Sequence, residues 1–417
     1  MKRALITGIS GFVGSHLAKE LVSRGWEVSG LVRRSTQSGV PSRLSRLGIA
    51  SSVSLLEGDI TDLASIIPAL GSAKPDAVFH LAAQSYVPRS FANPLETFLV
   101  NTSGTANLLE AVRSKGFDSK IVFAGSSEEY GLQLASEAQY EAALNKYGVV
   151  FPPPRSLPEL PVNETNPLRP MSPYAVSKVQ GDHLMQNYHY AYRMKTVVSR
   201  GFNQEGAGRS DHFVTADLVG QCIRLSRGEA QKIVVGNVNA LRDWSHVLDI
   251  VDGYMLLADK AAPGEVYVLG SMRMHSVLTY LLLTLAELGY EIEAVETSDG
   301  GKRLEQPLEE IQSSRFGVSW LSNALDDAII GGTLHYELND RGLIVTTSRA
   351  EVLVEFGPDR FRPAEVPMLI SDTRKIEALG FSVRRSLRDM IRDQIHYHLD
   401  SRNQLRHVAV ESQESLG

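Results

Sequence analysis

A glycine-rich loop near the start of the chain constrains the fold more than any other feature. The apolar run Ala4–Thr7 leads directly into residues 8–14, Gly-Ile-Ser-Gly-Phe-Val-Gly, and an amphipathic stretch follows. A strand, such a loop and a helix in this order are typical of a dinucleotide-binding unit, in which the glycines permit a tight turn, close approach to a pyrophosphate and close helix packing. A glycine-rich structural turn is the alternative, which the flanking strand and helix disfavour. The expected cofactor contacts are Gly8, Ser10, Gly11, Phe12, Val13 and Gly14.

Short β-branched runs alternate with longer amphipathic stretches over the first 200 residues. This pattern predicts an α/β fold, with a doubly wound parallel sheet of the Rossmann type covered by helices on both faces. The expected strands are near 3–7, 26–32, 52–58, 77–82, 120–126 and 196–202, and the expected helices near 12–24, 62–70, 94–115 and 173–193. Beyond residue 203 the alternation is irregular, with helices expected near 212–227, 246–259 and 276–288.

We therefore expect two domains, interleaved with one another: a cofactor-binding domain over 1–203 and a smaller α/β substrate-binding domain over 204–417. Residues 132–172 look like an insertion, with a short helix at Ser136–Tyr147 and then a stiff, Pro-rich extended loop. Residues 303–357 look like a second insertion. In it we expect an amphipathic stretch at 304–330 and a small antiparallel meander with strands at 334–338, 343–347 and 351–356.

The composition excludes several classes of protein. The 417 residues carry 42 Lys and Arg against 48 Asp and Glu, so the net charge is 42 − 48 = −6, and no basic run points to nucleic acid. The single cysteine, Cys222, cannot form an intrachain disulfide, which favours a reducing compartment, and we expect the cytoplasm. The apolar run 277–288 is shorter than the roughly 20 residues of a membrane helix, so no membrane association is expected. No histidine pair has metal-site spacing, and we expect no metal.

The end of the second expected strand indicates which dinucleotide binds. An acidic residue there would bind a free ribose 2′-hydroxyl, but this chain has Arg33 and Arg34. Two guanidinium groups favour the 2′-phosphate of NADP; a solvated basic turn is the alternative. Asp59 and Ile60 follow the third strand and are expected at the adenine, unless Asp59 is merely a helix N-cap.

Tyr174 and Lys178 lie four residues apart on a helix expected to begin after Ser172-Pro173, so both side chains share one face. An ammonium group and a cationic nicotinamide ring nearby would favour the phenolate, which makes Tyr174 a candidate base and lets Lys178 also hold a ribose hydroxyl. An exposed surface pair is the alternative for such a motif taken alone.

Another chemical group follows the strand at 120–126. In an extended chain, Ser126 and Glu128 would point to the same side of that strand, at the edge where ligands bind in α/β sheets. The hydroxyl of Ser126 could then bond a substrate oxygen, and the carboxylate of Glu128 could remove a proton from the neighbouring carbon. Capping of the strand end is the alternative for Glu128.

Taken together, these motifs resemble those of an extended short-chain dehydrogenase/reductase. The resemblance rests on the glycine loop, Leu-Ala-Ala-Gln-Ser at 81–85, Ser-Ser-Glu-Glu-Tyr-Gly at 126–131, Ser-Pro-Tyr-Ala-Val-Ser-Lys at 172–178 and Phe-Asn at 202–203. Residues 30–35, 236–246 and 362–366 are further similar to those of GDP-mannose 4,6-dehydratases. That family implies a bound NADP and the loss of water from GDP-mannose to form GDP-4-keto-6-deoxymannose, in a homodimer or homotetramer.

The resemblance also implies a role for each residue. Tyr174 would deprotonate the C4 hydroxyl, and Glu128 would take the C5 proton and then protonate the departing C6 hydroxyl. The residues implied at the cofactor are Leu81, Ala82, Ala83 and Arg209, and those implied at the substrate are Ser85, Ser126, Asn203, Arg242 and Glu365. For Arg209, Arg242 and Glu365, an ordinary ion pair is the alternative.

Some features depart from the family pattern. The glycine loop is closer to that of GDP-4-keto-6-deoxymannose reductases, Gln204 stands where a histidine is expected, and the insertion puts 46 positions between Glu128 and Tyr174. A reductase or a nucleotide-sugar 4-epimerase therefore stays an alternative, although neither needs a base at Glu128. A noncatalytic NADP-binding regulatory protein is a remoter alternative, which the presence of Ser126, Tyr174 and Lys178 together disfavours.

Overall fold

The computed structural model describes residues 1–34, 40–361, 366 and 368–404. The chain forms two compact units, each built from three separate segments. The first contains residues 1–204, 247–271 and 369–384, and the second contains residues 205–246, 272–368 and 385–417. A single boundary after residue 203 does not describe this division. Residues 247–271 belong to the first unit because they supply the strand β11 (Val266–Leu269), which pairs in parallel with β6 (Thr196–Gly201).

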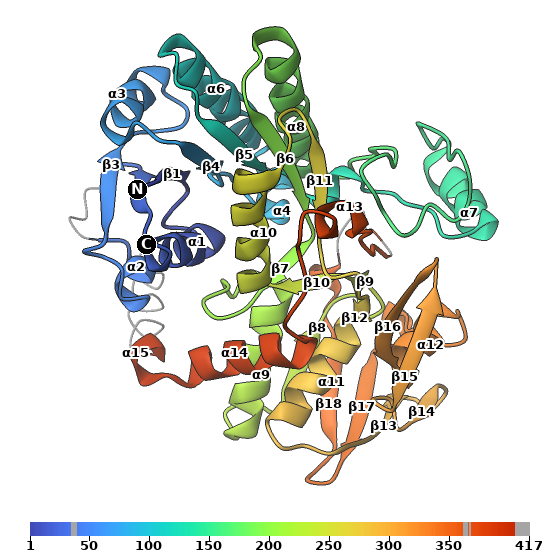
Figure 1. Cartoon of the computed structure of the whole chain (residues 1–417). Coiled ribbons are helices and arrows are strands. Elements are labelled where there is room, and N and C mark those ends of the chain that lie inside the picture. Colours follow the sequence, from blue (N-terminus) through green and yellow to red (C-terminus); the bar gives the residue numbers. More distant parts are fainter. Residues whose placement is uncertain (35–39, 362–365, 367, 405–417) are drawn as a thin grey trace. The chain divides into compact units, whose positions relative to one another are not determined.

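Seven parallel strands form the central sheet of the first unit, in the order β11-β6-β5-β4-β1-β2-β3 (Figure 1). The other strands are β1 (Arg3–Thr7), β2 (Glu27–Val32), β3 (Val53–Glu57), β4 (Ala77–His80) and β5 (Lys120–Ala124). This arrangement confirms the predicted doubly wound parallel sheet. The strand order reverses between β1 and β4, and ligands of such folds bind outside the carboxyl ends of the strands at that point.

Helices cover both faces of this sheet. Helices α1 and α10 pack in one apolar layer, and α3, α6 and α8 pack in the other (Figure 1). Burial on both faces explains the apolar runs in the central strands, such as the buried residues 4–6 of β1 and 121–123 of β5. The helices of this unit are α1 (Phe12–Ser23), α2 (Ser42–Arg46), α3 (Leu63–Ala73), α4 (Val87–Ala92), α5 (Pro94–Phe98), α6 (Gly104–Ser114), α7 (Glu137–Tyr147), α8 (Pro173–Tyr192), α10 (Val247–Lys260) and α13 (Arg374–Glu377).

The helix predicted over 94–115 is interrupted. A π-helical turn, Leu99–Ser103, separates α5 from α6. Within it, the Asn101 side chain accepts a hydrogen bond from the amide of Gln84 and donates to the carbonyl of Gln84 and to the hydroxyl of Ser177. The side chain thus joins three elements, and π-helical turns of this kind often occur at functional sites.

The insertion at 132–172 has a small apolar core of its own. Leu134, Ala143 and Val150 form its buried centre, and Ser136 caps the helix α7 by accepting a hydrogen bond from the amide of Gln139. The remainder of the predicted Pro-rich loop has no long regular element. It is held by a buried ion pair, since Nη1 of Arg169 lies 2.7 Å from Oε2 of Glu159.

The second unit contains a five-stranded sheet in the order β14-β13-β17-β18-β8. Its pairs are antiparallel except that of β18 with β8. The strands of this unit are β8 (Lys232–Val235), β9 (Leu241–Arg242), β10 (Trp244–His246), β12 (His275–Ser276), β13 (Ile292–Thr297), β14 (Arg303–Glu305), β15 (Glu310–Arg315), β16 (Val318–Asn323), β17 (Gly342–Thr347) and β18 (Val352–Phe356), and β7 (Asn203–Glu205) spans the boundary. The helices are α9 (Val214–Ser226), α11 (Val277–Glu287), α12 (Ala324–Ile330), α14 (Leu387–Leu399) and α15 (Ser401–Gln404).

One of the three strands predicted for the insertion at 303–357 is wrong. The stretch 304–330 forms β14, the hairpin of β15 and β16, and only a short helix α12, because β16 alternates buried and exposed residues with the period of a strand. Residues 334–338 form no strand, since the backbone of Tyr336 bonds in both directions to the side chain of Asn239. The other two predicted strands are present as β17 and β18.

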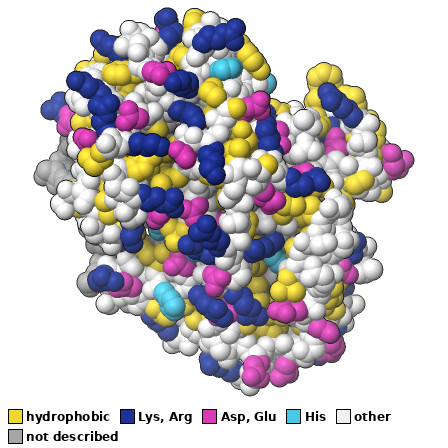
Figure 2. Space-filling model, viewed as in Figure 1, with side chains coloured by type: hydrophobic (Ala, Val, Ile, Leu, Met, Phe, Trp, Pro, Cys, Tyr) yellow, Lys and Arg dark blue, Asp and Glu magenta, His cyan; other side chains and the backbone are white. Residues whose placement is uncertain are grey.

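The structure also bears on membrane-spanning helices and on the distribution of surface charge. Among the described residues, no helix is both long and apolar enough to cross a membrane. The face of the molecule in Figure 2 carries Lys and Arg side chains interspersed with Asp and Glu, rather than a stripe of one sign.

Candidate active site

The glycine loop lies directly after β1, at the point where the strand order reverses. Gly8 has a φ of +77°, and a Cβ atom at this position would lie 2.8 Å from the amide nitrogen of Ala82. A Cβ at Gly14 would lie 2.2 Å from the carbonyl oxygen of Gly8. Gly11 precedes α1 and supplies no side-chain cap to the first amides of that helix. The loop therefore has the close backbone cradle and the uncapped helix N-terminus that a pyrophosphate needs.

The other three loop residues differ in exposure. Ser10 is exposed and Val13 is half-buried, whereas Phe12 is buried in the core layer that contains α1. A contact of Phe12 with a cofactor would therefore have to come from its backbone.

The residues expected at the adenosine follow β2 and β3. Arg33 and Arg34 are both exposed, and Asp59 is half-buried. The pKa of Asp59 is lowered, chiefly by a hydrogen bond from the backbone amide of Thr61 and also by the positive charge of Arg33. Arg33 and Asp59 therefore lie within electrostatic range of each other.

The alternative role for Asp59, a helix N-cap, is wrong. The cap of α3 is Asp62, which accepts a hydrogen bond from the amide of Ala64. The Asp59 carboxylate instead closes a local turn with Thr61, with Oδ1 2.8 Å from its amide nitrogen. Ile60 is buried in the core layer of α3 and α6.

The strand β4 ends at His80, whose buried imidazole joins three elements. Nδ1 lies 2.7 Å from the hydroxyl of Thr7, and Nε2 lies 2.9 Å from the hydroxyl of Thr105. The Thr7 hydroxyl also accepts a hydrogen bond from the amide of Ala82. Burial lowers the pKa of His80 to about 3, with a further contribution from Lys178. A neutral imidazole thus fixes the connection after β4, where Leu81, Ala82 and Ala83 are half-buried.

The chain turns sharply after β5. The strand ends at Ala124, and residues 127–129 form one turn of 3-10 helix, so the extended geometry predicted for Ser126 and Glu128 is wrong. The hydroxyl of Ser126 accepts a hydrogen bond from the amide of Glu128, and Oε1 of Glu129 accepts one from the amide of Ser126 at 2.7 Å. The reciprocal bonds form a capping box. The capping carboxylate is therefore Glu129.

The carboxylate of Glu128 takes no part in this capping box. Its side chain is half-buried, and in the part of the chain that the structure describes its carboxylate has no hydrogen-bond or ion-pair partner. The carboxylate is close enough to Tyr174 to raise the pKa of that phenol. The turn thus presents a carboxylate toward Tyr174 although the chain is not extended there.

Helix α8 places the other two candidate catalytic residues. Ser172 caps the helix by accepting a hydrogen bond from the amide of Ala175, and Pro173 occupies the first turn. Both Tyr174 and Lys178 are buried. Tyr174 is close enough to the Ser126 side chain for that side chain to lower the pKa of the phenol, and Nζ of Lys178 donates to the carbonyl oxygen of Ala124 at 2.6 Å. The structure therefore brings Ser126, Glu128, Tyr174 and Lys178 together at the carboxyl end of β5.

The electrostatics of this group differ from the prediction. The pKa of Tyr174 is raised, chiefly by burial, and negative charge on the nearby Glu128 and Glu129 raises it further, whereas the side chain of Ser126 acts in the opposite direction. Burial lowers the pKa of Lys178 to about 8, and negative charge on Glu129 acts against this change. The residues of the chain alone therefore do not favour the phenolate, because burial outweighs the effect of Ser126.

The remaining predicted site residues lie on other elements of the two units. Ser85 is exposed after β4, and Asn203 is half-buried in β7. In the second unit, Nε of Arg209 lies 3.4 Å from Oε2 of Glu205, which is an ion pair as in the alternative interpretation. Arg242 is buried in β9, where it is the cross-strand neighbour of His275 in β12. Glu365 lies outside the described residues.

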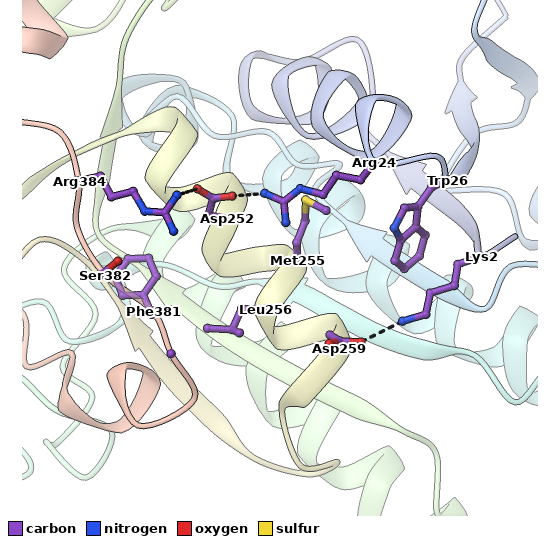
Figure 3. A pocket seen from close by; sticks show the side chains of 11 residues that line it. Lys2, Arg24, Trp26, Asp252, Met255, Leu256, Asp259, Phe381, Ser382 and Arg384 are labelled. Atoms are coloured by element: carbon purple, nitrogen blue, oxygen red, sulfur yellow. Dashed lines mark hydrogen bonds and ion pairs between the residues drawn. The ribbon is translucent and has the colours of Figure 1, made fainter.

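A cavity of about 350 Å³ lies elsewhere in the first unit, next to the start of β1 and β2. Figure 3 shows Lys2 directed toward Asp259, and Arg24 and Arg384 directed toward Asp252. The amino ends of parallel strands point away from the edge that carries the glycine loop and Tyr174. The cavity is therefore separate from the candidate active site, and its charged groups are paired with one another.

A comparison with models of protein families shows to which family this chain belongs. Residues 4–270, more than half of the 417, match the model of the NAD dependent epimerase/dehydratase family. The chain belongs to this family. The predicted membership of the extended short-chain dehydrogenase/reductases is thereby confirmed.

One relative and two solved structures are similar to this chain over most of its length. The chain is 30% identical over 407 residues to a GDP-mannose 4,6-dehydratase of Vibrio cholerae, covering 96% of this chain and 94% of the relative. Two solved structures share the fold. A UDP-glucose 4-epimerase from Bifidobacterium longum in complex with NAD+ and UDP superposes with a TM-score of 0.67 at 21% identity, covering 96% of this chain and 99% of that one. RMD from Pseudomonas aeruginosa complexed with NADPH gives 0.63 at 22%, covering 95% and 98%.

Several residues at the active site of this epimerase/dehydratase were not predicted. They are His80, Asn101, Glu129 and Asp182. Only Glu129 left a signal in the sequence, as a second acid beside Glu128 at the end of a strand. The other three act through buried contacts between elements distant in sequence, which no local pattern indicates.

Proposed function

We propose that this chain is an NADP-dependent GDP-mannose 4,6-dehydratase that forms GDP-4-keto-6-deoxymannose. The observation that carries the proposal is the carboxylate of Glu128, which has no partner among the described residues and lies close to the phenol of Tyr174. A reductase or epimerase needs the tyrosine but no second proton-transfer group beside it. The GDP-mannose 4,6-dehydratase of Vibrio cholerae, to which the chain is similar over almost its whole length, supports the same choice.

The residues of the first unit fit a dinucleotide. The cradle at Gly8 and Gly14, which a Cβ atom would fill, and the uncapped start of α1 suit a pyrophosphate. When bound, NADP would accept a hydride from C4 of the sugar, return one to C6, and bring a positive ring charge close to the phenol. Lys178 would hold the nicotinamide ribose through its ammonium group.

Two residues would carry out the first chemical step. Tyr174 would accept the proton of the C4 hydroxyl, for which its pKa must fall from the raised value that burial gives it. Ser126, which lies close to Tyr174, would donate to the C4 oxygen as that oxygen becomes a carbonyl. The buried surroundings of Tyr174 and Lys178 would keep water away from the reacting carbon.

Glu128 would carry out the elimination. A ketone at C4 makes the C5 hydrogen acidic, so a carboxylate can remove it. The proton then lies on Glu128, which would transfer it to the departing C6 hydroxyl and release water. One residue thus acts first as base and then as acid, and the reaction has no net change in oxidation state.

The preference for NADP over NAD rests on Arg33 and Arg34. Both side chains are exposed after β2, where their guanidinium groups could bind a 2′-phosphate. The related structures include one with NADPH and one with NAD+, so the fold does not distinguish the two cofactors. The arginine pair is the feature that favours NADP.

The two units would have different roles in the proposed reaction. The first unit would bind NADP, and the second would recognise the nucleotide sugar, with Arg242 and Glu365 at its GDP portion and Ser85 and Asn203 as polar contacts from the first unit. Arg209, whose guanidinium group is paired with Glu205, would contact the cofactor. We expect no metal, nucleic acid or membrane in the reaction and place the enzyme in the cytoplasm.

The exposed apolar side chains of the first unit point to an oligomer. Phe91, Leu95 and Leu99 lie in or next to α4 and α5 and are 41%, 81% and 52% exposed. Helix α8, which packs against these helices, exposes Tyr190 and Tyr192. A surface of this kind is typical of a subunit interface, so we propose a homodimer formed through it, or a tetramer containing that dimer.

Incubation of the purified chain with GDP-mannose, a catalytic amount of NADP and no reductant tests the proposal. We expect a 4-keto-6-deoxy product with no net formation of NADPH, and no turnover of UDP-glucose. Stoichiometric consumption of NADPH with a 4-keto sugar would indicate the reductase, and epimerisation of UDP-glucose would indicate the epimerase. Either result would contradict the proposal.

A further inference from the structure

A buried cluster of three ionisable side chains lies directly beneath the catalytic turn. Glu129 comes from the 3-10 turn, Asp182 from α8 and Arg200 from β6. The two acids are fully buried, and Arg200 is 5% exposed. Two carboxyl groups thus face a single guanidinium group in a buried environment, where an unpaired charge is very costly.

The cation is not shared equally between the two acids. Nε of Arg200 donates to Oδ2 of Asp182 at 2.7 Å, and the same nitrogen lies 3.5 Å from Oε2 of Glu129. Oε1 of Glu129 accepts the amide hydrogen of Ser126. Oε2 of Glu129 is buried and has no hydrogen-bond partner among the described residues. An ionised carboxylate would leave this charged oxygen unsatisfied.

We propose that Glu129 is a protonated, neutral residue in the working enzyme, that its proton lies on Oε2 and is shared with Asp182, and that it positions the Ser126–Glu128 turn. The proton gives the orphaned oxygen a hydrogen to donate to the neighbouring carboxylate of Asp182. The cluster then has one ionised acid for one guanidinium group, and its net charge is zero. Burial and the charge of Asp182 also raise the pKa of Glu129 well above its usual range.

The surrounding charges show why neutrality matters. Other ionisable groups surround this cluster. Tyr130, Tyr174 and Lys178 interact with Glu129, whereas Glu164 interacts with Tyr130, and Glu128 and Tyr254 interact with Tyr174. A negative charge on Glu129 would raise the pKa of Tyr174 and so oppose formation of the phenolate. A neutral acid supports Ser126 through the same hydrogen bond and leaves Glu128 as the one carboxylate charge of the turn.

The position is also sterically closed. A Cβ atom on Gly125 would lie 2.6 Å from Oε1 of Glu129 and 2.9 Å from the carbonyl oxygen of Ser199. Gly125 therefore has no room for a side chain, and the Glu129 carboxylate packs against the backbone of the turn while it holds the amide of Ser126. Glu129 touches neither substrate nor cofactor in this proposal and acts only through Ser126 and Glu128.

Infrared spectroscopy of the full chain near neutral pH tests the protonation state without any substrate. We expect a carbonyl stretching band of a protonated carboxylic acid, its loss in Glu129→Gln, and its retention in the control Glu141→Gln on the exposed surface of α7. Asp182→Asn should also remove the band, because Glu129 must then ionise to pair with Arg200. Absence of the band in the native chain, or its persistence in either Glu129→Gln or Asp182→Asn, would overturn the proposal.

Kinetics test the positioning role, which rests on the proposed function, whereas the infrared result does not. Glu129→Gln keeps an acceptor for the Ser126 amide and a donor for Asp182, so the pH at which kcat falls on the acid side should not move. Glu129→Leu leaves both partners without a bond, and kcat should fall roughly tenfold or more with KM for GDP-mannose nearly unchanged. An equal loss of kcat in the two variants, or full kcat in Glu129→Leu, would overturn the positioning role.

Discussion

The ammonium group of Lys178 donates a hydrogen bond to the carbonyl oxygen of Ala124 at 2.6 Å. This bond joins the second turn of α8 to the last residue of β5. Ala124 stands two residues before Ser126, so the lysine is tied to the strand that carries the catalytic turn. Burial of this ammonium group lowers its pKa to about 8, which is close enough to neutrality to have consequences for binding.

We therefore predict that the affinity for NADP falls as the pH rises through about 8. Below this value Lys178 is an ammonium ion that can hold a ribose hydroxyl, and above it the group loses both its charge and one donor. Isothermal titration calorimetry between pH 6.5 and about pH 9.5 measures the effect. Lys178→Met should bind more weakly and lose this pH dependence. An equal pH dependence in Lys178→Met would show that another group titrates.

Tyr174→Phe should lower kcat by about 10²–10⁴-fold, because the C4 hydroxyl loses its proton acceptor. NADP affinity should change little, since Lys178 and the glycine loop remain. The matched control is Tyr147→Phe, which removes a hydroxyl from a tyrosine that is 37% exposed on α7. Steady-state kinetics with GDP-mannose compare the two variants. Near-native kcat in Tyr174→Phe would exclude the tyrosine as the base.

Glu128→Gln should stop the elimination but permit oxidation at C4. We expect kcat to fall about 10²–10⁴-fold, with bound NADPH accumulating during a single turnover because the hydride is not returned. Absorbance of the reduced nicotinamide, followed by stopped flow, detects this species. Exchange of the C5 hydrogen with deuterated water should be lost as well. Continued exchange at C5 would mean that another group is the base.

His80 should make stability depend on pH through a depressed pKa. The imidazole has a pKa of about 3 in the folded chain against an ordinary 6.5, so only the unfolded chain takes up its proton between these values. The contribution is present above about pH 6.5 and is lost as the pH falls, by about 1.4 kcal/mol per pH unit. Urea unfolding of the native chain and His80→Asn should show a difference in unfolding free energy that narrows from pH 7 to about pH 5. A constant difference would contradict the assignment.

The fold of the first unit could be predicted from the sequence because its signals are local. The Gly8–Gly14 loop, the fully buried strands and the capped start of α8 at Ser172-Pro173 each specify their own conformation. The predictions failed where distant contacts decide the conformation. Asn101 interrupts a helix by bonding to Gln84 and Ser177, and Asn239 holds Tyr336 out of a strand.

Part of the candidate site could also be predicted, because its motifs are local in the sequence. Ser126, Glu128, Tyr174 and Lys178 belong to short motifs, so the sequence predicts the helix that carries the last two and the strand after which the first two lie, but not the turn that they form. The turn that orients Ser126 and Glu128 depends on the buried Glu129, whose contacts with Asp182 and Arg200 join positions more than 50 residues apart. The raised pKa of Tyr174 likewise follows from burial, which sequence spacing does not reveal.

The most direct test of the central claim follows one hydrogen atom through the reaction. GDP-mannose carrying deuterium at C4 is incubated with the chain and catalytic NADP in ordinary water, and the product is analysed by nuclear magnetic resonance. The account predicts a 4-keto-6-deoxy sugar with the deuterium at C6 and a solvent hydrogen at C5. A product without deuterium at C6, or recovery of unchanged GDP-mannose, would contradict it.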